Sequence, residues 1–463
     1  STNDLLEEIH LFGNSLTSID VSDKPNLREL KVHSNSIDSI DVSNNSLLTV
    51  LNVAINQLTS LDVSNNLLLV NLYAQSNQLT TMDLTNNDSL ELLQLHENSL
   101  TSVSGISNKI NLDHLQLQRN DLTSVDISGC VSLESTVNLY NNDLTSIDLT
   151  GNVSMTHLNA KDNELTSIDL STNDLLEEIN LFNNALTSID VSDKLNLVEL
   201  RVFSNSIDSI DVSNNPLLTV LHVAINQLNS LDVSNNLLLV NLYAQSNQLT
   251  TVDLTNNDSL ELLQLHENSL TSVSGISNKV NLDHLQLQRN ELTSVDISGC
   301  VSLESPVNLY NNDLTSINLT GNVAMTHFNA KDNELTSIDL STNDLLEEIT
   351  LRNNALSELD LTNKPNMNEI GTTGNDSLSC IYVSDIEYAQ ENWEINIDEW
   401  TSLCQGNVFS GPIWHVSTVG SDSPGGGSEE NPFATIQHAI ASVDTGDTII
   451  VHPGTYVENV DFG

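Results

Sequence analysis

Hydrophobic and polar residues follow one frame that repeats every 21 or 22 residues from position 1 to about 379. In each copy, an apolar residue precedes two free positions, a second apolar residue, one free position, a third apolar residue, two free positions and an Asn. Leu27–Leu48 is one such copy, with its Asn at Asn35. This Asn occurs 18 times between Asn14 and Asn375. Self-similarity at a short fixed period predicts a solenoid of stacked coils.

Two short strands are predicted in each coil. In Leu51-Asn52-Val53, and again in Leu61-Asp62-Val63, two apolar residues flank a polar one, which is the alternation of a strand with one buried face. A coil of 21 residues leaves no room for a helix on its outer side. We therefore predict an all-β-rich repeat solenoid with parallel sheets on both faces and little or no helix.

The frame resembles the leucine-rich repeat, and the match covers roughly four fifths of the chain. The second half of each coil, with its apolar-x-x-apolar-Asp-apolar core in Leu58–Val63, resembles the nested 21-residue class sometimes called IRREKO. The resemblance implies a scaffold that recognises a partner through its first-strand face. No nucleophile–base pair in the sequence has usable spacing, and we expect a protein that is not an enzyme.

A tandem duplication organises the solenoid, which we place at residues 1–379 with about 18 coils. Residues 1–170 and 171–340 differ at 17 of 170 positions, and a third copy begins at position 341. Seven of the changes lie on or beside the outward side of the first strand, including His33 to Phe203 and Asn52 to His222. Drift on a tolerant surface would produce the same distribution.

The composition changes after the last repeat, at residues 376–406. This stretch resembles the end cap of secreted leucine-rich-repeat proteins of Bacteroidetes-type bacteria. We take 380–406 as the cap and 407–412 as a linker. Cys380 and Cys404 flank a short non-repetitive segment and are predicted to form a disulfide, which suits an oxidising, extracellular setting. Cys130 and Cys300 occupy one position in the two copies and are expected to be buried.

Residues 413–463 look like the first coil of a right-handed parallel β-helix of the pectate-lyase-like superfamily. We predict a strand at Trp414–Ser417, a short amphipathic capping helix from Ala434 to Val443, and a strand at Thr448–Val451. Because the chain begins inside a coil and stops after one coil of this second pattern, we expect the natural protein to be longer.

The charge balance narrows the partner classes. Only 13 Lys and Arg residues oppose 63 Asp and Glu residues, for a net charge of −50. Nucleic acid is a poor partner because phosphate binding needs clustered cations. No apolar run approaches the ~20 residues of a membrane span, so we expect no membrane insertion. Such a surface suits a saline or calcium-rich medium, where ions screen its self-repulsion.

A column of Asp residues on the second strand is the first candidate for chemistry. Fourteen of seventeen units carry it, and Ser or Thr flanks it on both sides in all of these except the unit of Asp360. Carboxylates ~5 Å apart repel by ~1 kcal/mol per pair in water. Hydrogen bonds from neighbouring hydroxyls and amides could offset this, and so could bridging Ca²⁺ or Na⁺. The candidate calcium ligands are Asp20, Asp41, Asp62 and Asp83.

The outward residues of the first strand form the candidate binding face. Amides beside an aromatic ring suit hydrogen bonding and stacking to a sugar or an extended peptide, although a solvated polar sheet would look the same. The candidate residues are Tyr73, Gln75, Gln94, His96, Gln116 and Gln118 in the first copy and Tyr243, Gln245, Gln264, His266, Gln286 and Gln288 in the second.

The functional hypothesis is a secreted or bacterial cell-surface recognition and adhesion module. It would bind an extracellular protein or polysaccharide on the first-strand face and act as a rigid spacer. One alternative is the non-catalytic part of a polysaccharide-degrading enzyme whose β-helix lies downstream. Another is a self-associating filament or surface-layer component, for which near-identical tandem blocks are suited.

Overall fold

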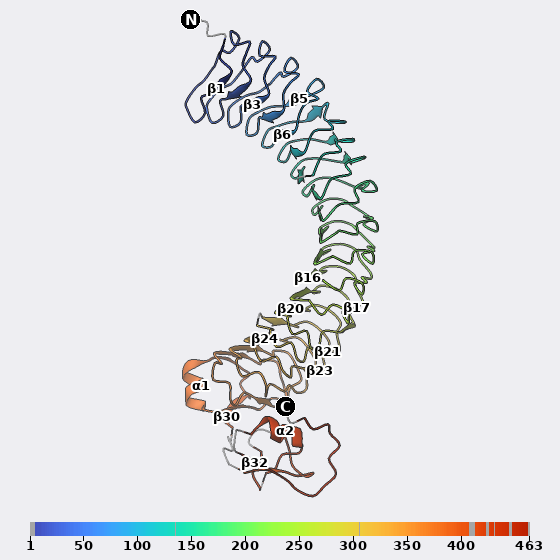
Figure 1. Ribbon diagram of the computed structural model, residues 1–463. Helices are drawn as coiled ribbons and strands as arrows, with labels where there is room; N and C mark the ends of the chain where they lie inside the picture. The colour runs from blue at the N-terminus through green and yellow to red at the C-terminus, as the bar shows by residue number, and fades with distance from the viewer. Residues whose placement is uncertain are drawn as a thin grey trace. The chain divides into compact units, whose positions relative to one another are not determined.

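The computed structural model describes residues 5–134, 136–304, 306–406, 413–422, 426–429, 431–443 and 447–461. The chain divides into two compact units, Ser1–Leu249 and Thr250–Gly463. Both units are built from parallel β-coils, which confirms the predicted fold class (Figure 1). The predicted linker, 407–412, lies outside the described residues.

In the first unit, each coil contributes one short strand to a parallel sheet, and each strand pairs in register with the strand of the next coil. The strands of this sheet are β1 (Glu8–His10), β2 (Glu29–Lys31), β3 (Val50–Asn52), β4 (Asn71–Tyr73), β6 (Leu92–Gln94), β8 (His114–Gln116), β10 (Val137–Asn138), β12 (His157–Asn159), β13 (Glu178–Asn180), β14 (Glu199–Arg201), β15 (Val220–His222) and β16 (Asn241–Tyr243). We call this the first-strand sheet.

The second unit carries a first-strand sheet of the same kind. Its strands are β18 (Leu262–Gln264), β20 (His284–Gln286), β22 (Val307–Asn308), β24 (His327–Asn329), β25 (Glu348–Thr350), β27 (Glu369–Gly371) and β29 (Glu394–Asn396). The last of these belongs to the cap, which therefore continues the sheet of the final coils.

The repeated frame explains why each coil closes. Leu30 and Val32 are fully buried, so the apolar positions of the frame form the core. The residue before each Asn, such as Ser34, has a left-handed backbone with φ 57°. The Asn35 amide then donates to Leu11 O at 2.9 Å, and its Oδ1 accepts from Leu16 N at 2.9 Å. The Asn thus satisfies backbone groups that the tight turn leaves unpaired.

Strand pairing on the second side is more limited than the prediction of one strand per coil. In the described part of the first unit it is confined to β5 (Thr81–Asp83) with β7 (Ser102–Ser104), and β9 (Ser124–Asp126) with β11 (Ser146–Asp148). In the second unit the pairs are β17 (Thr251–Asp253) with β19 (Ser272–Ser274), β21 (Ser294–Asp296) with β23 (Ser316–Asn318), and the three strands β26 (Leu359–Asp360), β28 (Cys380–Val383) and β30 (Ser402–Gln405).

The first two pairs in each unit lie at the 22-residue coils and their neighbours. The chains approach each other closely at these coils. Gly105 has φ +74°, and a Cβ on it would lie 2.4 Å from the Thr85 backbone N. Glycine is therefore required where one coil meets the backbone of the coil before it.

The cap and the C-terminal module contain the helices of the described residues, α1 (Ile386–Asn392) and α2 (Ile436–Ala441). Neither could cross a bilayer. The structure joins Cys380 to Cys404 in a disulfide, with Cα atoms 5.8 Å apart. In the C-terminal module, β31 (Ile413–Val416) pairs in parallel with β32 (Thr448–Val451), around a small core that includes Trp414 and Phe433.

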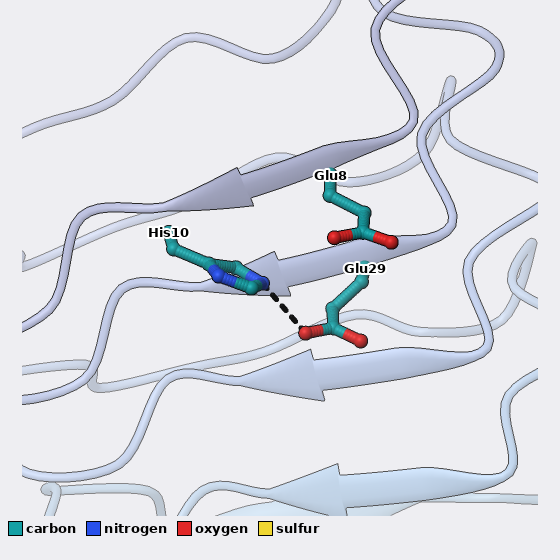
Figure 2. Close-up of side chains that lie close together, drawn as sticks. All are labelled: Glu8, His10 and Glu29. Carbon is teal, nitrogen blue, oxygen red and sulfur yellow. Dashed lines mark hydrogen bonds and ion pairs between the residues drawn. The ribbon is translucent and has the colours of Figure 1, made fainter.

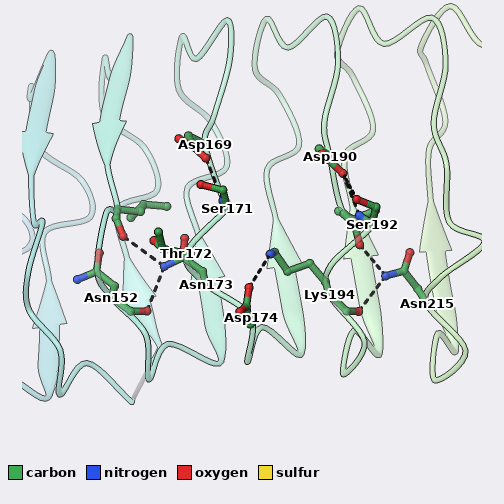
Figure 3. Close-up of polar contacts among 12 residues, drawn as sticks. Asn152, Asp169, Ser171, Thr172, Asn173, Asp174, Asp190, Ser192, Lys194 and Asn215 are labelled. Carbon is green, nitrogen blue, oxygen red and sulfur yellow. Dashed lines mark hydrogen bonds and ion pairs between the residues drawn. The ribbon is translucent and has the colours of Figure 1, made fainter.

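A second internal column, at the turn that leads back to the first strand, was not anticipated. It holds fully buried Asn residues such as Asn215, whose amide donates to Val191 O at 2.9 Å and Lys194 O at 2.8 Å. We call it the turn column (Figure 3). Every fourth coil places a Lys there instead. These lysines are Lys24, Lys109, Lys194, Lys279 and Lys364.

The Lys194 side chain is only 2% exposed, and its Nζ lies 3.5 Å from the exposed Asp174 carboxylate of the preceding coil. Lys279 and Lys364 have the same arrangement, and burial lowers the pKa of both ammonium groups. The turn column also contains Cys130 and Cys300, which are buried as expected.

Candidate functional site: the first-strand face

The first-strand face consists of the outward residues that lie six, four, two and one positions before the repeated Asn. Tyr73, Gln94 and Gln116 end neighbouring strands and stand in register in the first unit. Gln75, His96 and Gln118 follow them two residues later. The structure thus brings together the six candidate residues of the first copy. In the second copy, Tyr243 and Gln245 belong to the first unit.

The remaining candidates lie in the second unit, where Gln264 pairs in register with Gln286, and His266 and Gln288 follow them. Gln118 and Gln288 are each 7% exposed, and their side-chain oxygens have no hydrogen-bond donor. Burial also lowers the pKa of His96 and His266, so both imidazoles are neutral near pH 7. The two Gln oxygens are thus buried acceptors without a donor, and they are not exposed to a partner in this arrangement.

Positive charge is concentrated on this face. Five of the 13 basic residues belong to the turn column. The other eight all lie on the first-strand face or at the start of its strands: Arg28, Lys31, Arg119, Lys161, Arg201, Arg289, Lys331 and Arg352. The aromatic rings of the solenoid follow the same distribution, apart from the buried Phe328. The sequence reading missed this separation because it treated each column singly.

A continuous row of stacked rings crosses this face in the first unit. The ring centroids of Phe182 and Phe203 lie 4.2 Å apart, those of Phe203 and His222 4.1 Å, and those of His222 and Tyr243 4.6 Å. We call these four residues the ring ladder. Burial, with a smaller effect from the Arg201 charge, lowers the pKa of His222 to about 4.

Lys161 extends the ring ladder at one end. Its Nζ lies 5.0 Å from the ring centroid of Phe182 and 5.1 Å from that of Tyr140. In the first copy, Phe12 stacks on His33 at 4.7 Å, but Asn52 stands where the second copy has His222. The signal for the ring ladder was thus present among the 17 differences between the copies.

Most cations on this face are neutralised by carboxylates of neighbouring strands. Arg119 bonds to Glu97 at 2.7 Å, Arg28 lies 3.8 Å from Glu7, and Arg201 pairs with Glu199. Arg289 pairs with Glu267 in the second unit. Lys161 and Lys331 have no carboxylate partner among the described residues and contact aromatic rings instead.

One cluster has donors suited to a metal ion. Glu8, His10 and Glu29 place their ligand atoms within 4.8 Å of one another, and His10 Nε2 lies 2.6 Å from Glu29 Oε1 (Figure 2). Lys31, however, contacts the same Glu29 oxygen at 2.5 Å and is the main cause of the lowered pKa of Glu29. A metal ion would have to displace this ammonium. The second copy has Asn180 in place of His10.

The Asp column is solvent-exposed and bonded to its own turns. Asp20 Oδ1 accepts from Ser22 N at 3.0 Å and Ser22 Oγ at 2.7 Å, and these bonds lower the pKa of Asp20. Hydrogen bonds from the residue two positions on likewise lower the pKa of Asp41, Asp62 and Asp83. Figure 3 shows the same bond from Ser171 to Asp169 and from Ser192 to Asp190.

The structure therefore contains hydrogen bonds of the kind that could offset repulsion between the stacked carboxylates of the Asp column. Among the described residues, the cluster at Glu8 is the one set of three ligand atoms that lie within 4.8 Å of one another. The column forms no such set there, and calcium bridging by Asp20, Asp41, Asp62 and Asp83 stays a prediction.

Comparisons place the fold among known proteins. No family model and no curated protein sequence matches the chain. The functional domain of InlJ from Listeria monocytogenes is 25% identical, with a TM-score of 0.57, and the match covers 81% of this chain and 74% of InlJ. YopM from Yersinia enterocolitica is 23% identical, with a TM-score of 0.61, and the match covers 87% and 92%.

The Arabidopsis receptor kinase HAESA, solved in complex with the peptide hormone IDA and the co-receptor SERK1, is 21% identical. Its TM-score is 0.62, and the match covers 86% of this chain and 72% of the receptor. These similarities show that the chain has the solenoid fold of leucine-rich-repeat proteins.

Proposed function

We propose that this chain is a non-catalytic recognition module that binds a protein partner through its first-strand face. The observation that carries the proposal is the distribution of side chains in a chain with net charge −50. All eight basic residues outside the turn column, and all solenoid aromatic rings except Phe328, lie on or beside that face. Aromatic and Arg side chains are the groups that protein interfaces favour.

The comparisons support a protein partner, since HAESA with a similar fold was solved with a peptide and a co-receptor. The geometry of the ring ladder favours protein over sugar. The inner rings Phe203 and His222 are each covered on both faces by their neighbours at 4.1–4.6 Å, so a sugar ring has no free face of these two rings to stack on. A protein partner can instead contact the ring edges.

We further infer a secreted or cell-surface setting, with the solenoid acting as a rigid spacer. The Cys380–Cys404 disulfide supports an oxidising compartment. The 21-residue spacing supports the nested repeat class. The parallel pair β31 and β32 with α2 between them supports residues 413–463 as the start of a β-helix.

The test is a selection of displayed random 12-residue peptides on the immobilised chain, followed by affinity measurement with purified variants. We expect selected peptides to bind at least tenfold more weakly to a first-strand variant, either Gln94→Ala with His96→Ala or Phe203→His with His222→Asn. The matched control replaces two second-strand carboxylates, Asp41→Asn with Asp62→Asn, and should leave affinity unchanged. Failure to select any peptide, or loss confined to the control variant, would refute the proposal.

A further inference from the structure

We propose that Lys161 and the ring ladder form a docking strip for one extended segment of the protein partner. That segment carries an acidic side chain at the Lys161 end, followed by apolar side chains along the rings. The inference rests on the proposed function and deepens it by stating the chemistry of the partner. Lys161 and the four rings occupy five successive coils of the first unit. At ~4.8 Å per coil the strip is ~19 Å long, which matches about six extended residues.

Lys161 is the electrostatic anchor of the strip. The other four cations on this face of the first unit, namely Arg28, Lys31, Arg119 and Arg201, are each paired with a carboxylate of the chain. Lys161 is half-buried between two rings and has no carboxylate partner among the described residues. In a chain so rich in acids, an ammonium held in this way remains available for the carboxylate of a partner. A charge-assisted bond of this kind also fixes orientation.

Two amides beside the anchor suit a polypeptide backbone. Asn159 and Asn180 are half-buried on the strands that precede Lys161 and Phe182, and their Oδ1 atoms have no donor. The Asn159 amide nitrogen donates sideways to Asn138 Oδ1 at 3.1 Å, so its oxygen is the free acceptor. These oxygens are buried, so a peptide lying along the strip would donate backbone N–H groups to them only after the two amides rotate outward. An unsatisfied acceptor gains from such a bond because it is otherwise left without a partner.

The ring end of the strip is widened by an exposed aliphatic residue. Ile225, three residues after His222, has φ 52° and is 53% exposed. A β-branched residue is unfavourable in this left-handed conformation, and the residues before the Asn in the neighbouring coils are Ser204 and Ser246. Ile225 adds exposed apolar surface in the coil of His222, and the first copy shares this feature in Ile55, which has the same conformation and exposure.

The duplicated copies show how the strip is assembled. Phe182 and Tyr243 have the counterparts Phe12 and Tyr73 in the first copy, so the two ends of the ring ladder are shared. The two changes from His33 to Phe203 and from Asn52 to His222 complete the row. The apolar frame around them is unchanged. The double variant Phe203→His with His222→Asn therefore restores a combination that the same frame already accommodates in the first copy.

The experiment uses the tightest-binding peptide from the selection above, synthesised with a fluorescein label and a C-terminal amide. Its dissociation constant is measured by anisotropy with the full chain and its variants. We expect Phe203→His with His222→Asn, and separately Lys161→Gln, to weaken binding at least tenfold. Lys331→Gln is the matched control, because Lys331 also stacks on a tyrosine but is followed one coil later by Arg352 instead of a phenylalanine. It should change binding less than twofold.

The acidic residue of the peptide is then replaced by its amide. On the unaltered chain this change should cost about as much as Lys161→Gln, and on the Lys161→Gln variant it should cost less than twofold. Equal losses on both proteins would overturn the assignment of Lys161. Binding that requires a free C-terminal carboxylate would overturn the choice of an acidic side chain.

The remaining outcomes separate the two proposals. If the ring-ladder variant binds normally and Gln94→Ala with His96→Ala abolishes binding, the docking strip is wrong while the first-strand face still binds protein. If no variant of that face changes binding, the proposed function fails as well. Circular dichroism spectra and urea midpoints confirm that each variant is folded before its affinity is interpreted.

Discussion

His222 should make the first unit sensitive to mild acid. Its ring lies between Phe203 and Tyr243, and Arg201 is its in-register neighbour on the preceding strand. Burial, and then repulsion from Arg201, lower the pKa of His222 to about 4. Glu199 pairs with Arg201, and Val220 on the same strand as His222 is apolar. Protonation of His222 therefore adds a positive charge to the ring ladder without adding a carboxylate partner for it.

The sign of the effect follows from the two protonation states. In the unfolded chain the imidazole has its ordinary pKa of 6.5, so between pH 6.5 and about 4 the unfolded state binds a proton that the folded state lacks. The free energy of unfolding therefore falls as the pH falls through this window. The full pKa difference sets a ceiling of about 3.4 kcal/mol. Because the side chain is partly exposed, solvent screening reduces our expectation to about 1.5–2 kcal/mol.

The measurement is urea unfolding, followed by circular dichroism, of the chain and of His222→Asn at pH 7.5, 5.5 and 4.5. Many carboxylates also titrate on the way to pH 4.5, but they are common to both proteins, so the difference between the two curves isolates His222. We expect the variant to lose about 1.5–2 kcal/mol less than the parent chain between pH 7.5 and 4.5. Parallel curves, or a directly measured His222 pKa near 6.5, would refute the reasoning.

Three further predictions concern the scaffold. Asp174→Asn should lower the free energy of unfolding by about 1–2 kcal/mol, because it leaves the buried Lys194 ammonium unpaired, whereas Lys194→Asn should change it by less than about 0.5 kcal/mol; equal effects in urea would contradict this. Gly105→Ala should cost more than about 2 kcal/mol because its Cβ would meet the Thr85 backbone, and Gly13→Ala, at similar φ with open space, about 1 kcal/mol. Calcium should raise the melting temperature no more than NaCl of equal ionic strength, and a calcium-specific rise would instead support bridging of the Asp column.

The frame of each coil was predictable from residues that repeat at the coil period. Leu30, Val32 and Asn35 occupy one environment in every coil, so the pattern indicates both their burial and their role. The strand Thr448–Val451 was likewise predicted to the residue. Such positions are determined by local alternation and by contacts with the identical position one coil away.

Features with a longer period or a sideways contact were missed. The turn-column lysines recur only in every fourth coil. In most other coils an Asn occupies the same position, so the 21- or 22-residue pattern reveals the Asn and hides the Lys. The ring ladder changes column between Phe203 and His222, because the small Ala224 takes the position that would continue the column of Phe203. A comparison of the repeats aligns equivalent positions of successive coils. Ring contacts between non-equivalent positions depend instead on the direction in which each side chain points.

These two missed features together explain how so acidic a chain can present a specific face. The turn column takes five of the 13 cations, and four of them are buried there and pair with a carboxylate of the preceding coil. The other eight are concentrated on one side, while the Asp column keeps the second strand anionic. The cations outside the turn column therefore gather at the first-strand face. Among the described residues of that face in the first unit, the cation without a carboxylate partner is Lys161, beside the ring ladder.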